Sequence, residues 1–273
     1  MIPTKGIDVS EHNGAIDWTA VKKEGCKFAM IRAGYGKNMN QVDKFMAKNV
    51  AGCEAVGLDY GFYHYSYALD AAGAKKEAEF CLSLIRQHRP VYPIAFDIED
   101  KTQHPLSNQQ LTDIALAFLE TVKAAGYYVC LYSSLSWLAG KFDARADVYD
   151  KWVAQWASKP TYKQPFGIWQ YSSTGKVAGI NGDVDLNLAY KNYPEIIAAG
   201  GLNGFPKPQP SPQTPKTLDN TPSPWAEEAV EWAKKAGILL GGTDGDLRLH
   251  DAVTREEMCV ILKRFSDTAP LVN

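Results

Sequence analysis

The chain has 273 residues, of which 45% are apolar, 22% are charged and 11% are aromatic. This length and composition predict an ordinary globular protein with one large domain and a smaller addition. The formal net charge of −2 provides no basic surface for a nucleic acid, so we expect no nucleic-acid partner. No apolar run reaches the roughly 18 residues of a membrane span, and the start lacks a signal-peptide pattern, so we expect neither membrane insertion nor ordinary export.

The five cysteines are an odd number, widely spaced and without a Cys-x-x-Cys pair: Cys26, Cys53, Cys81, Cys130 and Cys259. We predict buried free thiols, which suit folding in a reducing cytoplasm. The five histidines are scattered, and no two of them flank a glutamate at helical spacing, so no metal site is predicted. The sequence also lacks the patterns of a serine nucleophile elbow and of a phosphate-binding loop.

Short β-type segments alternate with helical patterns over the first two thirds of the chain. The strand candidates are GIDVS, FAMIRAG, LDYGFYHYSYA, PIAFDIE, YYVCLYS, KWVAQWA and FGIWQYS. One helix is predicted between Ser107 and Gly126, because Leu111, Ile114 and Phe118 share an apolar face. This alternation predicts the α/β class and an eight-stranded (β/α) barrel, irregular because the last strand candidates follow one another without helices.

A proline-rich segment separates two parts of the chain. Prolines at nearly every other position through its middle remove backbone donors and prevent a helix or a sheet. We predict a barrel domain over residues 1–200, a semi-rigid linker over 201–224 and a small helix-loop-helix module over 225–273. In the module, Thr254 and Glu257 form a capping box that begins a helix. A unit this small is marginally stable alone, so we expect it to dock or to self-associate.

The strand candidate YPIAFDIED ends in carboxylates, which a buried strand does not need. Asp97 and Glu99 are two residues apart, so they project from one face with Cα atoms about 6.5–7 Å apart, while Ile98 points the other way. Two such carboxyls can differ in pKa, one ionised and one protonated, as glycosidic cleavage requires. The alternative is a strand that simply leaves the core into a charged loop.

Further acids lie at other strand ends: Asp8 ends the first strand, and Asp183 and Asp185 follow the last one. In a closed barrel these acids would meet at one mouth, although each could also form a turn or a helix cap. Arg32 is a buried cation that needs one of these acids as its partner. Aromatic side chains also cluster at strand ends and suit the apolar faces of sugars, although such residues more often pack in a core. They are Tyr63, Tyr65, Tyr132, Trp156, Trp169 and Tyr171.

Together these motifs resemble glycoside hydrolase family 25, the Chalaropsis-type lysozymes of bacteria and their phages. The resemblance covers residues 1–195 and is carried, in order, by GIDVSEHNGAIDW, FAMIRAGYG, GFYHYSYA, FDIED, WVAQW and IWQYSSTGKVAGINGDVDLN. It implies an irregular eight-stranded α/β barrel, no cofactor, and cleavage of the β-1,4 bond between N-acetylmuramic acid and N-acetylglucosamine in bacterial peptidoglycan.

The same resemblance assigns roles to the four acids. Glu99 is the expected proton donor, and Asp97 is either the nucleophile or the carboxylate that steadies the substrate's own N-acetyl group as it attacks. Asp8 and Asp185 match the other two acids of the family's active site, which orient the sugar and hold the charge states apart. Net retention is expected for both forms of the mechanism, which the sequence does not distinguish.

The resemblance also indicates a substrate-binding set. Tyr63, Tyr132 and Trp156 match aromatic residues that contact the sugar, and we expect Arg32 to contribute as well. Asn13 stands where many relatives have glutamine, a departure at the edge of the site that bears on fine specificity.

The terminal segment is similar to one S-layer-homology repeat, with Thr254, Arg255 and Glu257 in its characteristic motif. This resemblance implies binding of a secondary cell-wall polymer, for which we expect Trp225 and Arg255 to be contacts. One repeat is present where that family normally packs three. Self-association through this unit is therefore an alternative of equal weight.

The sequence as a whole predicts a peptidoglycan hydrolase, an N-acetylmuramidase, with an anchoring tail. One alternative is a non-catalytic glycan-binding protein on an inactive barrel, which the presence of all four acids disfavours. Another is a structural wall protein that acts through its terminal repeat, although a lone repeat is a weak anchor. The free thiols and the missing signal peptide fit a phage endolysin that stays in the host cytoplasm until lysis and then acts on the cell wall. The alternative is extracellular release by a non-classical route.

Overall fold

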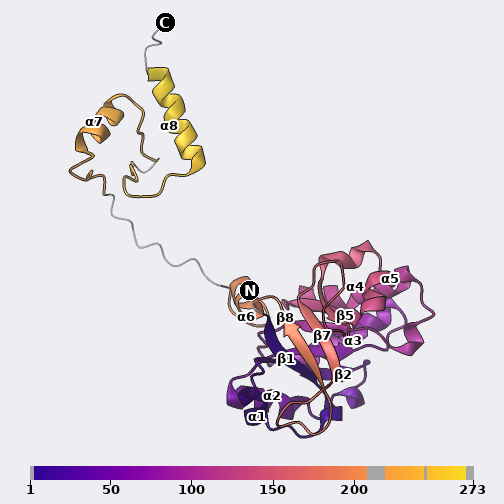
Figure 1. Ribbon diagram of the computed structural model, residues 1–273. Coiled ribbons are helices and arrows are strands. Elements are labelled where there is room, and N and C mark those ends of the chain that lie inside the picture. The colour runs from indigo at the N-terminus through magenta and orange to yellow at the C-terminus, as the bar shows by residue number, and fades with distance from the viewer. Residues whose placement is uncertain (1–2, 208–218, 243–244, 269–273) are drawn as a thin grey trace. The chain divides into compact units, whose positions relative to one another are not determined.

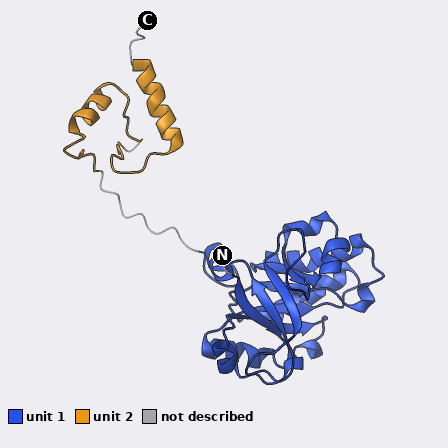
Figure 2. Cartoon of the chain, in the orientation of Figure 1, with its two compact units in different colours: residues 1–209 blue, residues 210–273 orange. Residues whose placement is uncertain are grey.

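The computed structural model describes residues 3–207, 219–242 and 245–268. The chain divides into two compact units, Met1–Gln209 and Pro210–Asn273 (Figure 2). Residues 208–218 of the predicted proline-rich linker lie outside the described residues. None of the helices in the described ranges is long and apolar enough to cross a bilayer.

Eight strands close into a barrel in chain order in the first unit (Figure 1). They are β1 (Thr4–Val9), β2 (Phe28–Tyr35), β3 (Asp59–Tyr65), β4 (Ile94–Asp97), β5 (Val129–Ser134), β6 (Asp150–Ala154), β7 (Ile168–Gly175) and β8 (Val184–Ala189). Neighbours from β1 to β7 pair in parallel, whereas β8 is antiparallel to both β7 and β1. The predicted irregular eight-stranded α/β barrel is confirmed, and β6, β7 and β8 follow one another without a helix between them.

Helices accompany the strands in this unit. They are α1 (Trp18–Lys23), α2 (Met46–Val56), α3 (Ala71–Ile85), α4 (Asn108–Ala124), α5 (Leu135–Gly140) and α6 (Tyr193–Gly200), with 3₁₀ turns η1 (Glu11–Asn13), η2 (Met39–Gln41), η3 (Lys101–Gln103) and η4 (Ala144–Val148). The predicted helix is α4: the side chain of Ser107 caps it, and Gly126 adopts a left-handed φ of 88° just after its end. Its predicted apolar face is fully buried.

Strand alternation divides the core into two layers. On β2, Ala29 and Ile31 belong to the larger cluster, which includes the inner faces of the helices, whereas Phe28 and Met30 belong to a smaller cluster inside the barrel. The ring of Phe28 stacks on that of Tyr92 with centroids 4.3 Å apart. The barrel interior is therefore packed with side chains at this level, so a substrate has to bind at an end of the barrel.

Two sequence expectations need correction here. Four cysteines are buried and unpaired as predicted, but Cys259 is exposed. The linker was expected to begin at residue 201, yet Asn203 is fully buried, and its side-chain amide donates to the carbonyl oxygens of Pro90 (2.8 Å) and Tyr92 (3.0 Å). The chain after α6 thus still packs on the barrel, because this buried asparagine satisfies backbone acceptors there.

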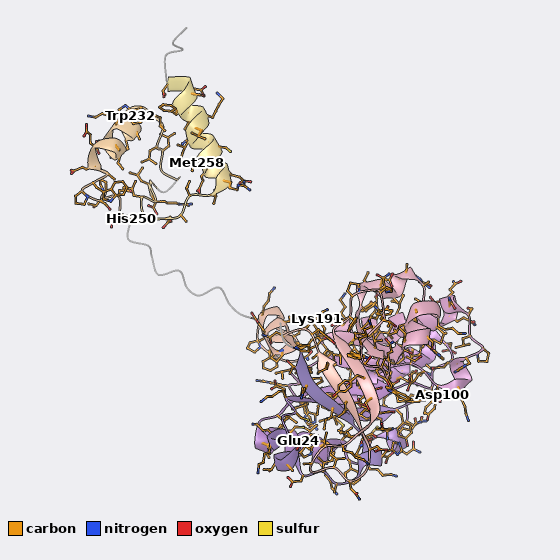
Figure 3. The ribbon with its side chains drawn as sticks, viewed as in Figure 1. Glu24, Asp100, Lys191, Trp232, His250 and Met258 are labelled. Atoms are coloured by element: carbon orange, nitrogen blue, oxygen red, sulfur yellow. The ribbon has the colours of Figure 1, made fainter. Side chains whose placement is uncertain are left out.

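The second unit contains α7 (Glu227–Lys235) and α8 (Arg255–Thr268). The predicted capping box is present, since the Thr254 amide donates to Glu257 Oε2 (2.8 Å) and the Glu257 amide donates to Thr254 Oγ1 (3.1 Å). Trp225, an expected polymer contact, lies before α7, and its side chain is exposed. Neither helix buries a residue, and Trp232 of α7 meets Phe265 of α8 with ring centroids 6.3 Å apart (Figure 3 labels Trp232).

Candidate active site

A cleft of about 730 Å³ opens at the end of the barrel where β1 and β4 terminate. The carboxyl ends of barrel strands are where enzymes of this architecture place their reacting groups. All eight barrel residues predicted for the site line this cleft: Asp8, Arg32, Tyr63, Asp97, Glu99, Tyr132, Trp156 and Asp185.

Asp97 and Glu99 reach the cleft from the end of β4. Asp97 is the last residue of the strand and is buried, whereas Glu99, two residues later, is half-buried. Ile98 between them is fully buried in the cluster that faces the helices. Its backbone is held by β5, because its amide donates to the Tyr132 carbonyl (3.2 Å) and its carbonyl accepts from Ser133 Oγ (2.7 Å). The expected alternation therefore places both carboxyls in one cleft.

The surroundings of Asp97 and Glu99 favour the protonated form of these carboxyls. Burial raises the pKa of Asp97 well above its ordinary value, the charges of Glu99 and Asp8 raise it further, and Arg32 opposes them. Burial also raises the pKa of Glu99, with the charge of Asp185 as the next contribution. Because neighbouring buried carboxylates repel one another, the cluster holds at least one proton at a pH where isolated acids are ionised.

Asp8 and Asp185 face each other across the β1–β8 ladder. Asp185 was expected to follow the last strand; it is instead the second residue of β8. Since β8 is antiparallel to β1, its beginning reaches the barrel end at which β1 terminates. Burial and the Asp185 charge raise the pKa of Asp8. Burial raises that of Asp185, and its contact with Asp8 lowers it. Burial therefore disfavours the ionised form of both acids, although hydrogen bonds from Asn187 and Gln170 favour it at Asp8.

Arg32 forms its ion pairs with acids that the sequence analysis did not select. Its Nε lies 2.8 Å from Asp43 Oδ2, and one terminal nitrogen lies 3.0 Å from Glu11 Oε1. The expectation of a partner among the acids at the strand ends was therefore wrong. Arg32 acts on Asp97 through space, by lowering its pKa. Its guanidinium also lies over the ring of Tyr35, 5.3 Å from the centroid.

Aromatic side chains form part of the cleft wall. Tyr63 and Tyr132 pack edge to face against Trp152, with ring centroids 6.0 and 4.5 Å away. Trp156 is 66% exposed at the rim, which leaves an indole face free for a flat ligand. Trp169 does not line the cleft, because it is buried and its indole nitrogen donates to the Gln155 carbonyl (2.8 Å). Tyr171 is not among the lining residues either.

Comparison with known proteins decides the family. Residues 7–180 match the family model described as Glycosyl hydrolases family 25. The chain belongs to glycosyl hydrolase family 25. This confirms the resemblance drawn from the motifs, and it makes the protein a glycoside hydrolase of the lysozyme type, the class that hydrolyses the glycan of bacterial peptidoglycan. Residues 216–259 match the S-layer homology domain.

Several family 25 members resemble this chain. Lysozyme M1 of Streptomyces globisporus is 33% identical over 209 residues, 71% of this chain and 70% of that protein. The modular autolysin LytC of Streptococcus pneumoniae, solved with a synthetic peptidoglycan ligand, has a TM-score of 0.63 and 30% identity over 69% of this chain and 47% of LytC. A lysozyme of Streptomyces coelicolor has a TM-score of 0.62 and 29% identity over 74% of this chain and 98% of its own. The chain thus spans less than half of LytC.

The sequence did not lead us to predict two amide side chains that contact the acids of this family 25 barrel. Gln170 Nε2 (2.9 Å) and Asn187 Nδ2 (2.7 Å) both donate to Asp8 Oδ2. Gln170 Oε1 accepts from the Tyr132 hydroxyl and the Trp156 indole nitrogen, each at 3.2 Å. The sequence did contain a signal: IWQYS and DLNLA each have a polar residue in the middle of a strand. A polar side chain inside a packed barrel needs a hydrogen-bond partner there.

Within residues 3–207, 219–242 and 245–268, no group of three or more His, Cys, Asp or Glu side chains is placed to hold an ion. The carboxyls that line the cleft can supply acid–base and nucleophilic chemistry.

Proposed function

We propose that this family 25 enzyme is an N-acetylmuramidase, which cleaves the β-1,4 bond between N-acetylmuramic acid and N-acetylglucosamine with net retention. The single observation that carries the residue roles is a buried carboxylate oxygen, Asp97 Oδ1, which has no hydrogen-bond partner within the described residues. An unpaired buried acceptor is costly unless a ligand uses it. In a cleft lined by Glu99 and aromatic rings, that ligand is the reacting sugar.

The two carboxyls then divide the work. Glu99, the half-buried and more accessible member of the pair, gives its proton to the glycosidic oxygen as the bond to the anomeric carbon breaks, while the charge of Arg32 favours the ionised form of Asp97. Asp97 attacks that carbon, or it accepts a hydrogen bond from the substrate's acetamido N–H while the acetamido oxygen attacks. Water next reacts at the same carbon and passes its proton to Glu99. Two inversions restore the starting anomeric configuration, so the product is retained.

Mass spectrometry of fragments released from purified peptidoglycan tests this proposal. Wild type should release muropeptides that end in reducing N-acetylmuramic acid, and Glu99→Gln should not. Glu24→Gln, which changes a glutamate outside the cleft (Figure 3), is the matched control and should behave as wild type. Fragments that end in reducing N-acetylglucosamine would contradict a muramidase. No release by wild type would support the alternative, a binding protein on an inactive barrel, and equal release by Glu99→Gln would assign the acid role elsewhere.

Proton NMR of the nascent reducing end tests retention. A β-anomer that appears first and then mutarotates is the expected result. An α-anomer at the earliest times would mean inversion, and the assigned role of Asp97 would then be wrong.

We also propose that the S-layer homology unit holds the enzyme on the bacterial cell wall by binding a secondary wall polymer. Trp225 is 89% exposed, and Arg255 at the start of α8 forms no ion pair among the described residues, so both are free to contact a polyanionic glycan. Co-sedimentation of full-length protein with walls should weaken in Trp225→Ala and Arg255→Ala, and it should weaken similarly when the wall polymer is extracted, with the remaining binding due to the barrel. Unchanged binding after extraction would favour self-association as the role of this unit.

For its cellular route, we propose accumulation in a host cytoplasm before phage lysis and action on the wall afterwards. The four buried free thiols support folding in a reducing compartment. Fractionation of infected cells before and after lysis tests this route, and early appearance of the protein outside intact cells would favour non-classical release.

A further inference from the structure

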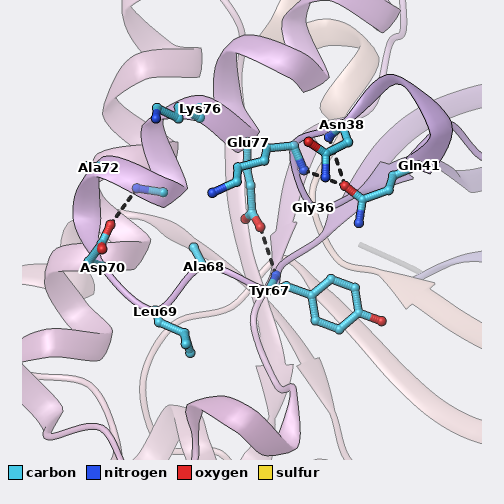
Figure 4. Close-up of a pocket in the computed structure, with 12 residues that line it drawn as sticks. Gly36, Asn38, Gln41, Tyr67, Ala68, Leu69, Asp70, Ala72, Lys76 and Glu77 are labelled. Atoms are coloured by element: carbon cyan, nitrogen blue, oxygen red, sulfur yellow. Dashed lines mark hydrogen bonds between the residues drawn. The ribbon is translucent and has the colours of Figure 1, made fainter.

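A second cavity, of about 510 Å³, adjoins the catalytic cleft and has no part in the roles assigned above. The loop from Gly36 to Gln41, the segment from Tyr67 to Asp70 and the first turns of α3 form its walls (Figure 4). Tyr67 lines both this cavity and the cleft. Its ring meets those of Tyr35 and Tyr65, both in the cleft wall, with centroids 6.2 and 5.2 Å away. The cleft and the cavity are therefore neighbours, with Tyr67 as their common wall.

Hydrogen bonds hold the walls of this cavity in place before any ligand binds. Gln41 Oε1 accepts from the backbone amides of Lys37 (3.0 Å) and Asn38 (2.8 Å). Gly36 has a left-handed φ of 60°, and a Cβ there would lie 2.5 Å from Gln41 Nε2, so this turn requires glycine. On the opposite wall, Gln103 Nε2 donates to the Ala68 carbonyl (2.9 Å). A preformed cavity binds without first ordering a loop.

Charged side chains of both signs line the cavity, and two of them are exposed lysines. Lys37 and Lys76 are exposed, and neither forms an ion pair among the described residues. Two acids also line the cavity: Glu77 is buried and hydrogen-bonded within the protein, whereas Asp70 is exposed. Asp70 Oδ1 caps α3 by accepting from the Gly73 amide, and the buried Glu77 accepts from Ser66 Oγ (2.7 Å) and from the Tyr67 amide (2.9 Å). A ligand in the cavity would therefore meet the ammonium groups of Lys37 and Lys76 beside the exposed carboxylate of Asp70.

Apolar surface accompanies these cations. Leu69 is 53% exposed and Tyr67 is 45% exposed on the same short segment (Figure 4). A ligand that complements this surface carries small alkyl groups together with free carboxylates. An additional neutral sugar needs hydroxyl partners and gains little from two unpaired ammonium groups.

We propose that this cavity is a subsite for the acidic stem peptide of peptidoglycan, which is attached through the lactyl ether of the muramic acid bound in the cleft. This inference rests on the proposed muramidase function. The alkyl side chains of the peptide pack on Tyr67 and Leu69, and its carboxylates pair with Lys37 and Lys76. The subsite favours strands that carry peptides over bare glycan.

Two soluble substrates separate this role from the catalytic chemistry. The substrates are uncross-linked glycan strands with stem peptides and the same strands after an amidase has removed the peptides. For Lys37→Ala/Lys76→Ala, kcat/KM on peptide-bearing strands should fall roughly tenfold, mainly through KM, since each exposed ion pair contributes modestly. On bare strands the kcat/KM of the variant should equal that of the wild type. Lys75→Ala, an exposed lysine of α3 outside the cavity, should match wild type on both substrates.

Three results would overturn the subsite: an equal loss on both substrates, no loss on peptide-bearing strands, or an equal effect of Lys75→Ala. Calorimetric titration of amidase-released stem peptides into the full-length chain keeps this test independent of catalysis. Binding to wild type that is lost in the double variant supports the subsite even if neither protein cleaves glycan, in which case only the proposed muramidase function fails. No peptide binding together with unchanged hydrolysis removes the subsite and leaves the muramidase intact.

Discussion

Gln170 on β7 donates a hydrogen bond to Asp8 on β1 over 2.9 Å, across the antiparallel strand that separates them. The other end of the same amide accepts from the Tyr132 hydroxyl and the Trp156 indole. One side chain thus fixes the orientation of an acid and of two aromatic residues in the cleft wall. Its hydrogen bond also lowers the pKa of Asp8, against the burial that raises it.

We expect Gln170→Ala to reduce kcat roughly tenfold to a hundredfold, because loss of orientation at a reacting site has effects of that size. The pKa of Asp8 should rise further without this donor, so the inflection of the pH–rate profile that belongs to the acid cluster should move to higher pH. Steady-state kinetics across pH checks both effects. Gln155→Ala is the control, since that side chain bonds only to Thr161 outside the cleft. A wild-type profile for Gln170→Ala would contradict an orienting role.

Asp97→Asn should stabilise the fold while it abolishes activity. Burial and the charges of Glu99 and Asp8 raise the folded pKa of Asp97 above its unfolded value, so this carboxyl costs stability progressively as pH rises between those two values. The neutral variant escapes that cost, and we expect a gain of about 1–2 kcal/mol above neutral pH that disappears near the unfolded pKa. Urea unfolding at both pH values measures it. Equal stability at high pH would mean that Asp97 is not strained by its neighbours.

Asp100→Asn provides a comparison of opposite sign for that experiment. Burial is the largest single effect and raises the pKa of Asp100, but hydrogen bonds from Thr102 and Tyr65 together outweigh it and the net pKa is lowered. A carboxyl of this kind adds stability once it is ionised, above its unfolded pKa. Asp100→Asn should therefore not stabilise the protein at neutral pH.

Arg32→Leu should destabilise the protein by about 3–5 kcal/mol, because it leaves the buried carboxylate of Asp43 without its cation. The double variant Arg32→Leu/Asp43→Asn removes that uncompensated charge and should recover much of the loss. A double-mutant cycle by chemical denaturation measures the coupling. Purely additive losses would contradict the ion pair as the source of stability.

Glu77 should make the free energy of unfolding fall as pH rises. Burial raises its folded pKa from 4.5 to about 7, so the folded state binds a proton more tightly than the unfolded state does between those values. The cost across this window is up to about 3 kcal/mol, and Glu77→Gln should remove it. Buried His64, whose pKa burial lowers to about 4, makes stability rise with pH over an overlapping window in both proteins. The difference between the two stability curves therefore isolates Glu77, and parallel curves would contradict the prediction.

The apolar residues of α8 allow self-association to be tested. Met258, Leu262 and Phe265 are all exposed (Figure 3 labels Met258). If copies of the chain associate through this helix, the full-length protein should show a concentration-dependent mass in sedimentation equilibrium, and Leu262→Glu should abolish it. Lys263→Glu, on the same helix, should not. A monomer at all concentrations would leave wall-polymer binding as the proposed role of this unit.

Sequence alone determined the features that depend on local order along the chain. The apolar period between Ser107 and Gly126 specifies α4, and the period of two on a strand places Asp97 and Glu99 on one side with Ile98 on the other. Alternation of strands and helices was enough for the barrel class.

Only the tertiary structure decided which distant residues meet. Closure of the barrel by an antiparallel β8 sets Asp185 opposite Asp8, and it brings Gln170 within hydrogen-bond distance of the same carboxylate. The partners of Arg32 are likewise Glu11 and Asp43, which no local pattern had marked. The physical reason is that side-chain period is a property of each strand by itself, whereas strand direction, register and ion pairing depend on how separate segments pack together.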